Sequence, residues 1–139
     1  MRTMGLDLGT VRIGVSLSDV MGWIAQPAVV IRRKDDESDF AEIERIIEEN
    51  EVSEIVIGLP MNMDGSLGPM AEKVQKFTKE LEERFNKPVY EWDERLSSVA
   101  AERVLIESNM RRDKRKHVID KVAAAYILQG FLDKRAMGR

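Results

Sequence analysis

The chain has 139 residues with a formal net charge of −3, which suits one domain with a buried core and confines any nucleic-acid footprint to a local patch. The absence of cysteine excludes disulfides and thiolate metal sites and favours a reducing compartment, the cytoplasm, while the single histidine cannot build a multi-histidine zinc site. We expect neither a membrane span nor a signal peptide, because no long apolar run occurs.

Alternating apolar residues predict three strands at the start of the chain. The first runs from about Thr3 to Leu8 and the second from Arg12 to Ser18, close enough for an antiparallel hairpin around Gly9 and Thr10. A third strand is expected at Pro27–Arg33.

Helices and strands alternate in the rest of the chain. After a first helix, a continuously apolar strand is predicted at Glu54–Pro60, and Pro69 can begin the next helix. A fifth strand lies within Lys87–Glu94, and two more helices are expected at about 98–108 and 117–134, separated by a basic run. This order is typical of an α/β domain whose five-stranded mixed sheet is covered by helices on both faces, and short linkers favour a single domain over residues 1–139.

Acidic residues occur where a sheet of this kind binds ligands, outside the strand ends. Asp7 lies within the first strand, where an unpaired carboxylate is costly. Asp93 and Glu94 end the fifth strand, and they approach Asp7 if the first and fifth strands are neighbours. Taken singly, Asp7 could instead accept backbone hydrogen bonds in the adjacent turn, and the other two could be solvated.

A further acid on a third element, Asp120, shares a helix face with apolar residues. At helical spacing it is aligned with Ala123, Ala124 and Ile127, which predicts that it faces the sheet. The alternative is an ion pair with Lys121 or Arg12. Converging carboxylates repel one another unless a divalent cation neutralises them, so we expect Mg²⁺ or Mn²⁺. Two such cations roughly 3.5–4 Å apart can clamp a phosphodiester.

Four ordered segments resemble a known family: GLDLGTVRIGVSLSD, IVIGLPMNMDGSLGP, DERLSSVAAERVL and DKVAAAYILQGFLD. They are similar to the YqgF family of Holliday-junction-resolvase-like nucleases of pre-16S ribosomal RNA. The resemblance implies an RNase H-like fold and a metal-binding catalytic triad of Asp7, Glu94 and Asp120, with Asp93 as second choice. It further implies a metal-dependent phosphodiester endonuclease that processes the 5′ end of pre-16S rRNA during ribosome biogenesis.

Polar and basic residues near these acids are candidate nucleic-acid contacts, although each could also be a turn residue, a solvated charge or part of an ion pair. Thr10 and Arg12 follow the first strand, Asn62 follows the fourth, and Arg95 follows the fifth. The basic run supplies the remaining candidates, which are Arg111, Arg112, Lys114, Arg115 and Lys116.

Three further functions compete with cleavage of pre-rRNA. A junction-type DNA resolvase would take structured DNA, but the chain lacks obvious insertions for gripping a junction as an intimate dimer. We therefore favour RNA as the partner of a monomer or weak dimer, without a membrane. A non-catalytic RNA-binding assembly factor would not need the intact acid set. An ATPase of the actin or sugar-kinase type would need two such domains, whereas this chain is long enough for only one domain.

Overall fold

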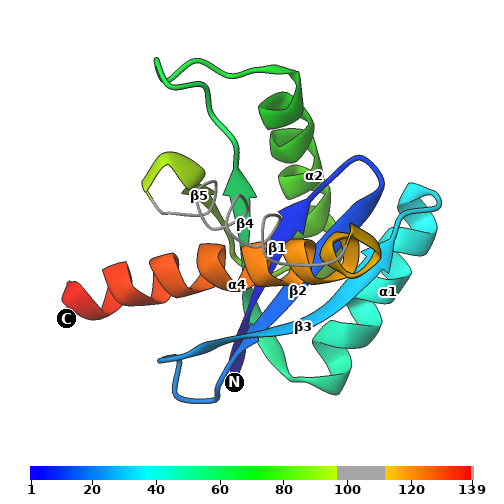
Figure 1. The fold of residues 1–139 in the computed structure, drawn as a ribbon. Coiled ribbons are helices and arrows are strands. Elements are labelled where there is room, and N and C mark those ends of the chain that lie inside the picture. The colour runs from blue at the N-terminus through cyan, green and yellow to red at the C-terminus, as the bar shows by residue number, and fades with distance from the viewer. Residues whose placement is uncertain (97–111, 139) are drawn as a thin grey trace.

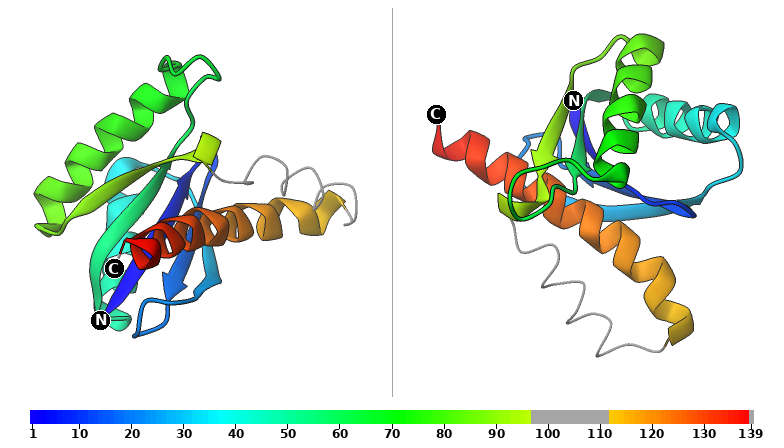
Figure 2. Two further views of the ribbon diagram at one scale, coloured as in Figure 1. Left: turned by 90° about the vertical axis from the view of Figure 1, so that its left-hand side faces the viewer. Right: turned by 90° about the horizontal axis from the view of Figure 1, so that it is seen from above.

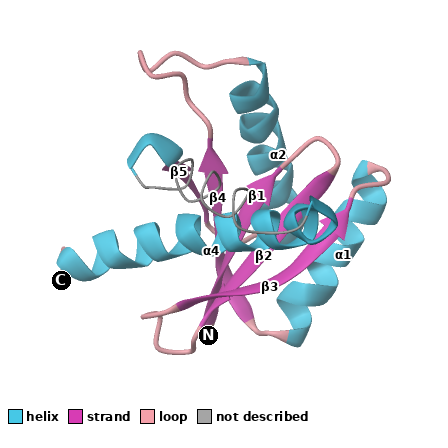
Figure 3. Cartoon of the chain, in the orientation of Figure 1, coloured by secondary structure: helices cyan, strands magenta, loops and turns pink. Residues whose placement is uncertain are grey.

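The computed structural model describes the backbone of residues 1–96 and 112–138, and the side chains of residues 1–96 and 119–138. Its strands form one sheet (Figure 3). They are β1 (Arg2–Leu8), β2 (Arg12–Ser18), β3 (Ala25–Arg32), β4 (Val52–Leu59) and β5 (Val89–Asp93).

The strand order is β3-β2-β1-β4-β5. β2 pairs antiparallel with β1 and β3, whereas β4 pairs parallel with β1 and β5, so the predicted mixed sheet is confirmed. The first and fifth strands are not neighbours, because β4 lies between them, so the condition under which the sequence brought their acids together is not met. The edge strand β3 begins at Ala25, before the predicted Pro27, and an edge strand tolerates the missing proline N–H.

Two helices cover one face of the sheet, α1 (Asp36–Glu49) and α2 (Pro69–Phe85). Figure 2 shows both on the side opposite α4. Pro69 begins α2 as predicted, and Phe40 of α1 stacks on Phe77 of α2 with ring centroids 4.8 Å apart. Both rings are buried, so α1 and α2 close this face of the sheet to solvent there.

The long helix α4 (Arg112–Met137) crosses the other face (Figure 1). Ala123, Ala124 and Ile127 are buried in the core between α4 and the sheet, so helices cover both faces as predicted. The helix begins at Arg112 and not at the expected 117, because arginine and lysine are good helix formers and the basic run does not interrupt it. The helix predicted at 98–108 lies outside the described residues.

Glycines in the strands let α4 lie close to the sheet. A Cβ atom added to Gly14 of β2 would overlap the backbone carbonyl oxygen of Asp120. A Cβ atom added to Gly58 of β4 would lie 2.5 Å from the Cδ1 atom of Ile127. Small residues on both surfaces therefore allow the close approach, alanines on α4 and glycines on the sheet. Within the residues described, no helix has the length and apolar character needed to cross a membrane.

Candidate active site

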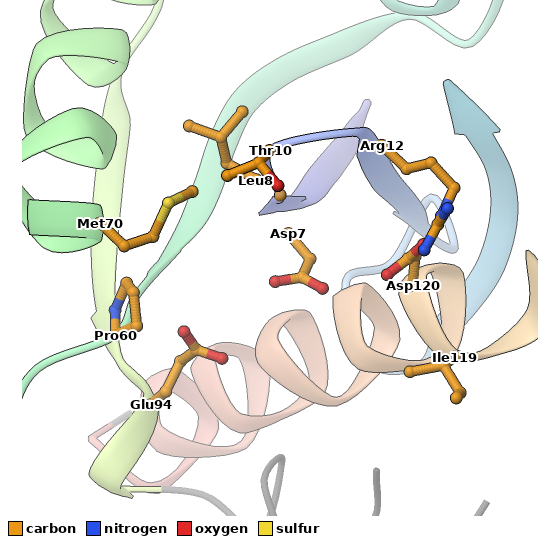
Figure 4. A pocket seen from close by; sticks show the side chains of 10 residues that line it. Asp7, Leu8, Thr10, Arg12, Pro60, Met70, Glu94, Ile119 and Asp120 are labelled. Atoms are coloured by element: carbon orange, nitrogen blue, oxygen red, sulfur yellow. The ribbon is translucent and has the colours of Figure 1, made fainter. Parts of the chain in front are cut away.

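A pocket of about 450 Å³ opens where β1 ends, between the start of α2 and the first half of α4 (Figure 4). It contains the three acids of the predicted triad. The residues that line it are Asp7, Leu8, Gly9, Thr10, Arg12, Pro60, Met70, Glu94, Ile119 and Asp120.

Asp7 is held at the centre of the pocket by its strand. It is 8% exposed and pairs across the ladder with Gly14 of β2, the glycine against which the backbone of Asp120 packs. Figure 4 shows the Asp7 carboxylate between those of Glu94 and Asp120. Because β1 is bonded on both sides, the position of Asp7 is rigid.

Glu94 reaches the same pocket although β4 separates its strand from β1. It begins a short 3₁₀ turn, η1 (Glu94–Leu96), directly after β5. Gly58 of β4 makes room, since a Cβ atom there would lie 3.3 Å from the carboxyl carbon of Glu94. A glycine in the intervening strand thus allows acids from non-adjacent strands to face one space.

Asp93 points to a different partner. Its carboxylate accepts a hydrogen bond from Nη2 of Arg95 at 2.7 Å and another from the Arg95 backbone N–H at 2.9 Å. These bonds, chiefly those from the guanidinium, hold the pKa of Asp93 below its ordinary value. Of the two neighbouring acids, the structure brings Glu94 to Asp7 and leaves Asp93 paired with Arg95.

Asp120 faces the pocket from α4 and forms an ion pair there. The Nε atom of Arg12 donates to its Oδ2 atom at 2.5 Å, and the two side chains are 28% and 22% exposed. The inward orientation predicted for Asp120 is confirmed, and so is the alternative of a pair with Arg12. The two findings are compatible because Arg12 lies on β2, and the backbone of Asp120 packs against Gly14 of the same strand.

The other predicted contact residues divide into two groups. Thr10 and Arg12 line the pocket, in the turn where the Gly9 N–H donates to the carbonyl of Arg12 at 2.9 Å. Asn62 and Arg95 do not line it. The Asn62 amide donates to Ser66 within its own loop, whereas Arg95 binds Asp93.

The basic run lies at the beginning of α4. Arg111 falls outside the described residues, and the side chains of Arg112, Lys114, Arg115 and Lys116 fall outside the described side chains. Their helical backbone places this charge one to two turns before Asp120.

The donor set of the pocket suits a hard divalent cation, since its charged donors are carboxylate oxygens and its only sulfur among the lining residues is the thioether of Met70, not a thiolate. Across residues 1–96 and 119–138, no three acids or histidines stand close enough together to share one ion. The positive charge next to Asp120 is the guanidinium of Arg12. The guanidinium of Arg12 therefore neutralises the carboxylate of Asp120, one of the three in the pocket.

Sequence reasoning missed the two glycines that shape the site. Gly14 lets Asp120 approach β2, and Gly58 opens the space between Asp7 and Glu94. Glycine inside an apolar strand was the available signal, since it marks a close approach of backbone or ligand.

Comparisons with known proteins agree with this architecture. The model of the family described as "RuvX: Holliday junction resolvase" matches residues 1–134. A protein of Halothermothrix orenii named "Putative pre-16S rRNA nuclease" is 56% identical over 133 residues, which cover 96% of this chain and 95% of its own. One of the same name from Moorella thermoacetica is 52% identical, with 96% of each chain covered.

A solved structure shares the fold. It is described as "T. thermophilus RuvC in complex with Holliday junction substrate", and its TM-score to this chain is 0.61 over 99% of this chain and 96% of that one. Its sequence identity of 15% makes this a likeness of fold alone. The predicted RNase H-like fold class is thereby confirmed.

Proposed function

The chain belongs to the RuvX family, and from that premise we propose that it is a metal-dependent nuclease that hydrolyses phosphodiesters. One observation supports this most strongly: the carboxylates of Asp7, Glu94 and Asp120, from three separate elements, line one open pocket. Carboxylates brought into one pocket repel one another, and a divalent cation can neutralise this repulsion and bind a phosphate beside it.

The three carboxylates would hold Mg²⁺ or Mn²⁺, whose preferred ligands are oxygen atoms. We propose a two-cation site, because a bound pair supplies a nucleophile at neutral pH and neutralises charge on the leaving oxygen of a phosphodiester. Glu94 is the ligand from the end of β5, and Asp93 is the second choice, since Arg95 already binds it.

The chain's own residues bind and orient the nucleic acid. Thr10 and Arg12 line the pocket, and they would bind a phosphate beside Asp7. Asn62 lies on the loop after β4 and Arg95 lies in η1 after β5, where they would contact the nucleic-acid strand beyond the cleaved bond. Farther along α4, the basic run would neutralise backbone phosphates.

Pre-16S rRNA is the substrate that we propose, processed at its 5′ end during ribosome biogenesis in the cytoplasm. The names of the two relatives support this substrate. The family description favours a second candidate, a four-way DNA junction. Cleavage of RNA needs no symmetric pair of sites, so we propose a monomer or weak dimer, whereas junction resolution requires two.

The test is to incubate the purified protein with pre-16S rRNA and with a four-way DNA junction, each with Mg²⁺, Mn²⁺ or EDTA. We expect cleavage near the 5′ end of the RNA with either metal, none in EDTA, and an intact junction. Cleavage of the junction alone would identify the second candidate. Binding of RNA without cleavage under every condition would contradict the nuclease and identify an assembly factor.

A further inference from the structure

Arg12 is the one cation in the described lining of the acidic pocket. Its Nε atom donates to Oδ2 of Asp120 at 2.5 Å, and this is the only ion pair of Arg12 within the described part of the chain. Both side chains retain about a quarter of their exposure, so water and ions reach the pair from the pocket.

The geometry of this pair suits a contact that is made and broken. A guanidinium binds a carboxylate most strongly through two parallel hydrogen bonds, and here the contact is through Nε alone. Partly exposed single pairs contribute little to stability. A divalent cation carries twice the charge of the guanidinium, so it can replace the guanidinium at Asp120 at small cost.

A second pair on the same helix shows what a permanent contact looks like. Near the other end of α4, Arg135 binds both carboxylate oxygens of Glu54, from Nη1 at 2.5 Å and from Nη2 at 3.1 Å. Its guanidinium also lies over the ring of Phe131, 4.4 Å from the centroid. Among the residues whose side chains are described, Arg12 has neither a second carboxylate bond nor a ring contact.

We propose that Arg12 is an exchangeable countercharge. It neutralises Asp120 while the pocket lacks a cation, and it releases Asp120 when a divalent cation binds. The freed guanidinium, beside Thr10 at the rim, then binds a phosphate of the incoming nucleic acid. This inference rests on the proposed nuclease function, because it assigns Asp120 to the cation.

The test is calorimetric titration of Mn²⁺ into the full-length protein and its variants. Arg12→Gln removes the competing charge, so it should bind Mn²⁺ about three- to tenfold more tightly than the wild type. In an Asp120→Asn background the same substitution should leave Mn²⁺ affinity unchanged. The matched control is Arg135→Gln, which removes the equivalent charge at the far end of α4 and should bind Mn²⁺ as the wild type does.

Two results would overturn the exchange. If the wild type binds Mn²⁺ and cleaves RNA, but Arg12→Gln binds Mn²⁺ equally or more weakly, Arg12 does not compete and only this inference fails. If the wild type neither binds Mn²⁺ nor cleaves, the nuclease proposal fails with it. Should Arg12→Gln not fold, Arg12→Met serves in its place, because it also removes the charge but keeps the length of the side chain: tighter binding than the wild type supports exchange, and equal or weaker binding contradicts it.

Discussion

The two ends of α4 are joined to the sheet by the same chemistry but in different settings. Near its start, Asp120 pairs with Arg12 of β2 at the rim of an open pocket. Near its end, Arg135 pairs with Glu54 of β4, which also accepts a hydrogen bond from the Thr3 hydroxyl at 2.9 Å.

The two pairs differ in what surrounds the carboxylate. Burial alone would raise the pKa of Glu54, yet the hydrogen bonds from Arg135 and Thr3 outweigh it and hold that pKa below its ordinary value of 4.5. That carboxylate has its partners within the fold. Asp120, by contrast, shares its open pocket with two further acids, Asp7 and Glu94, and we propose that a cation binds there.

The largest expected effect comes from the central acid of the pocket. Asp7→Asn keeps the shape of the side chain but removes the charge that would hold a cation. Metal-dependent cleavage should fall by about 10³-fold. Thermal stability without metal should hold or rise, because a repelling acid is lost. Glu54→Gln is the control that should keep its cleavage rate, and full activity of purified Asp7→Asn would remove this residue from the reaction.

The basic residues at the two ends should also differ in effect. Neutralising Arg111, Arg112, Lys114, Arg115 and Lys116 should weaken RNA binding at least about tenfold. Each lost phosphate contact should flatten the log–log salt dependence by roughly 0.7. Neutralising Lys134, in the last turns of α4, is the control and should change neither quantity. Affinity measured across a salt series checks this, and unchanged slopes would make the basic run a solvated segment.

The packing of Asp120 against β2 can be disturbed by a substitution that changes no acidic residue. Gly14→Ala would place a Cβ atom on the Asp120 carbonyl, so backbone must shift. We expect a loss of roughly 1–3 kcal/mol in the free energy of unfolding, together with reduced cleavage. Gly138→Ala, where the nearest atom would be 3.7 Å away, is the control at the far end. Denaturant titration measures both, and equal stability of the two variants would contradict the close approach.

The smallest effect is expected at the far end and depends on pH. The depressed pKa of Glu54 stabilises the fold above the unfolded-state value, and that contribution is lost as the pH falls below about 4.5. Glu54→Gln should therefore cost about 1 kcal/mol at pH 7 and progressively less in acid. Urea titrations from pH 7 to pH 3 measure the difference. A gap that stays constant across this range would contradict the role of the charge.

Local patterns predicted much of this molecule. Period-two alternation predicted the first strands, and a continuous apolar run predicted β4. Helical spacing placed Asp120 on the inner face of its helix, and the recognition of the family from four motifs is confirmed by the match over residues 1–134. The single domain over the whole chain, the metal and the residue roles stay predictions.

Non-local features were not predictable in the same way. The place of β4 between β1 and β5 depends on pairing between distant segments, so the sequence could state the approach of Glu94 to Asp7 only on the condition that β1 and β5 are neighbours, which they are not. The choice between Asp93 and Glu94 depends on the 3₁₀ turn after β5, which the alternation of a strand does not encode. The surroundings of Asp120 depend on its close approach to Gly14 of β2, which the sequence of the helix does not encode. In the structure Asp120 both lines the pocket with Asp7 and Glu94 and pairs with Arg12.

Thermal melts across a Mg²⁺ and Mn²⁺ titration test the central claim, that Asp120 is a metal ligand. A cation that binds only the folded protein stabilises it by mass action, about 2.7 kcal/mol at a concentration 100 times its Kd. The account predicts that Glu54→Gln starts from a lower Tm but keeps the full metal-induced rise, whereas Asp120→Asn loses most of it. Equal loss of stability by Asp120→Asn with and without metal would contradict the assignment.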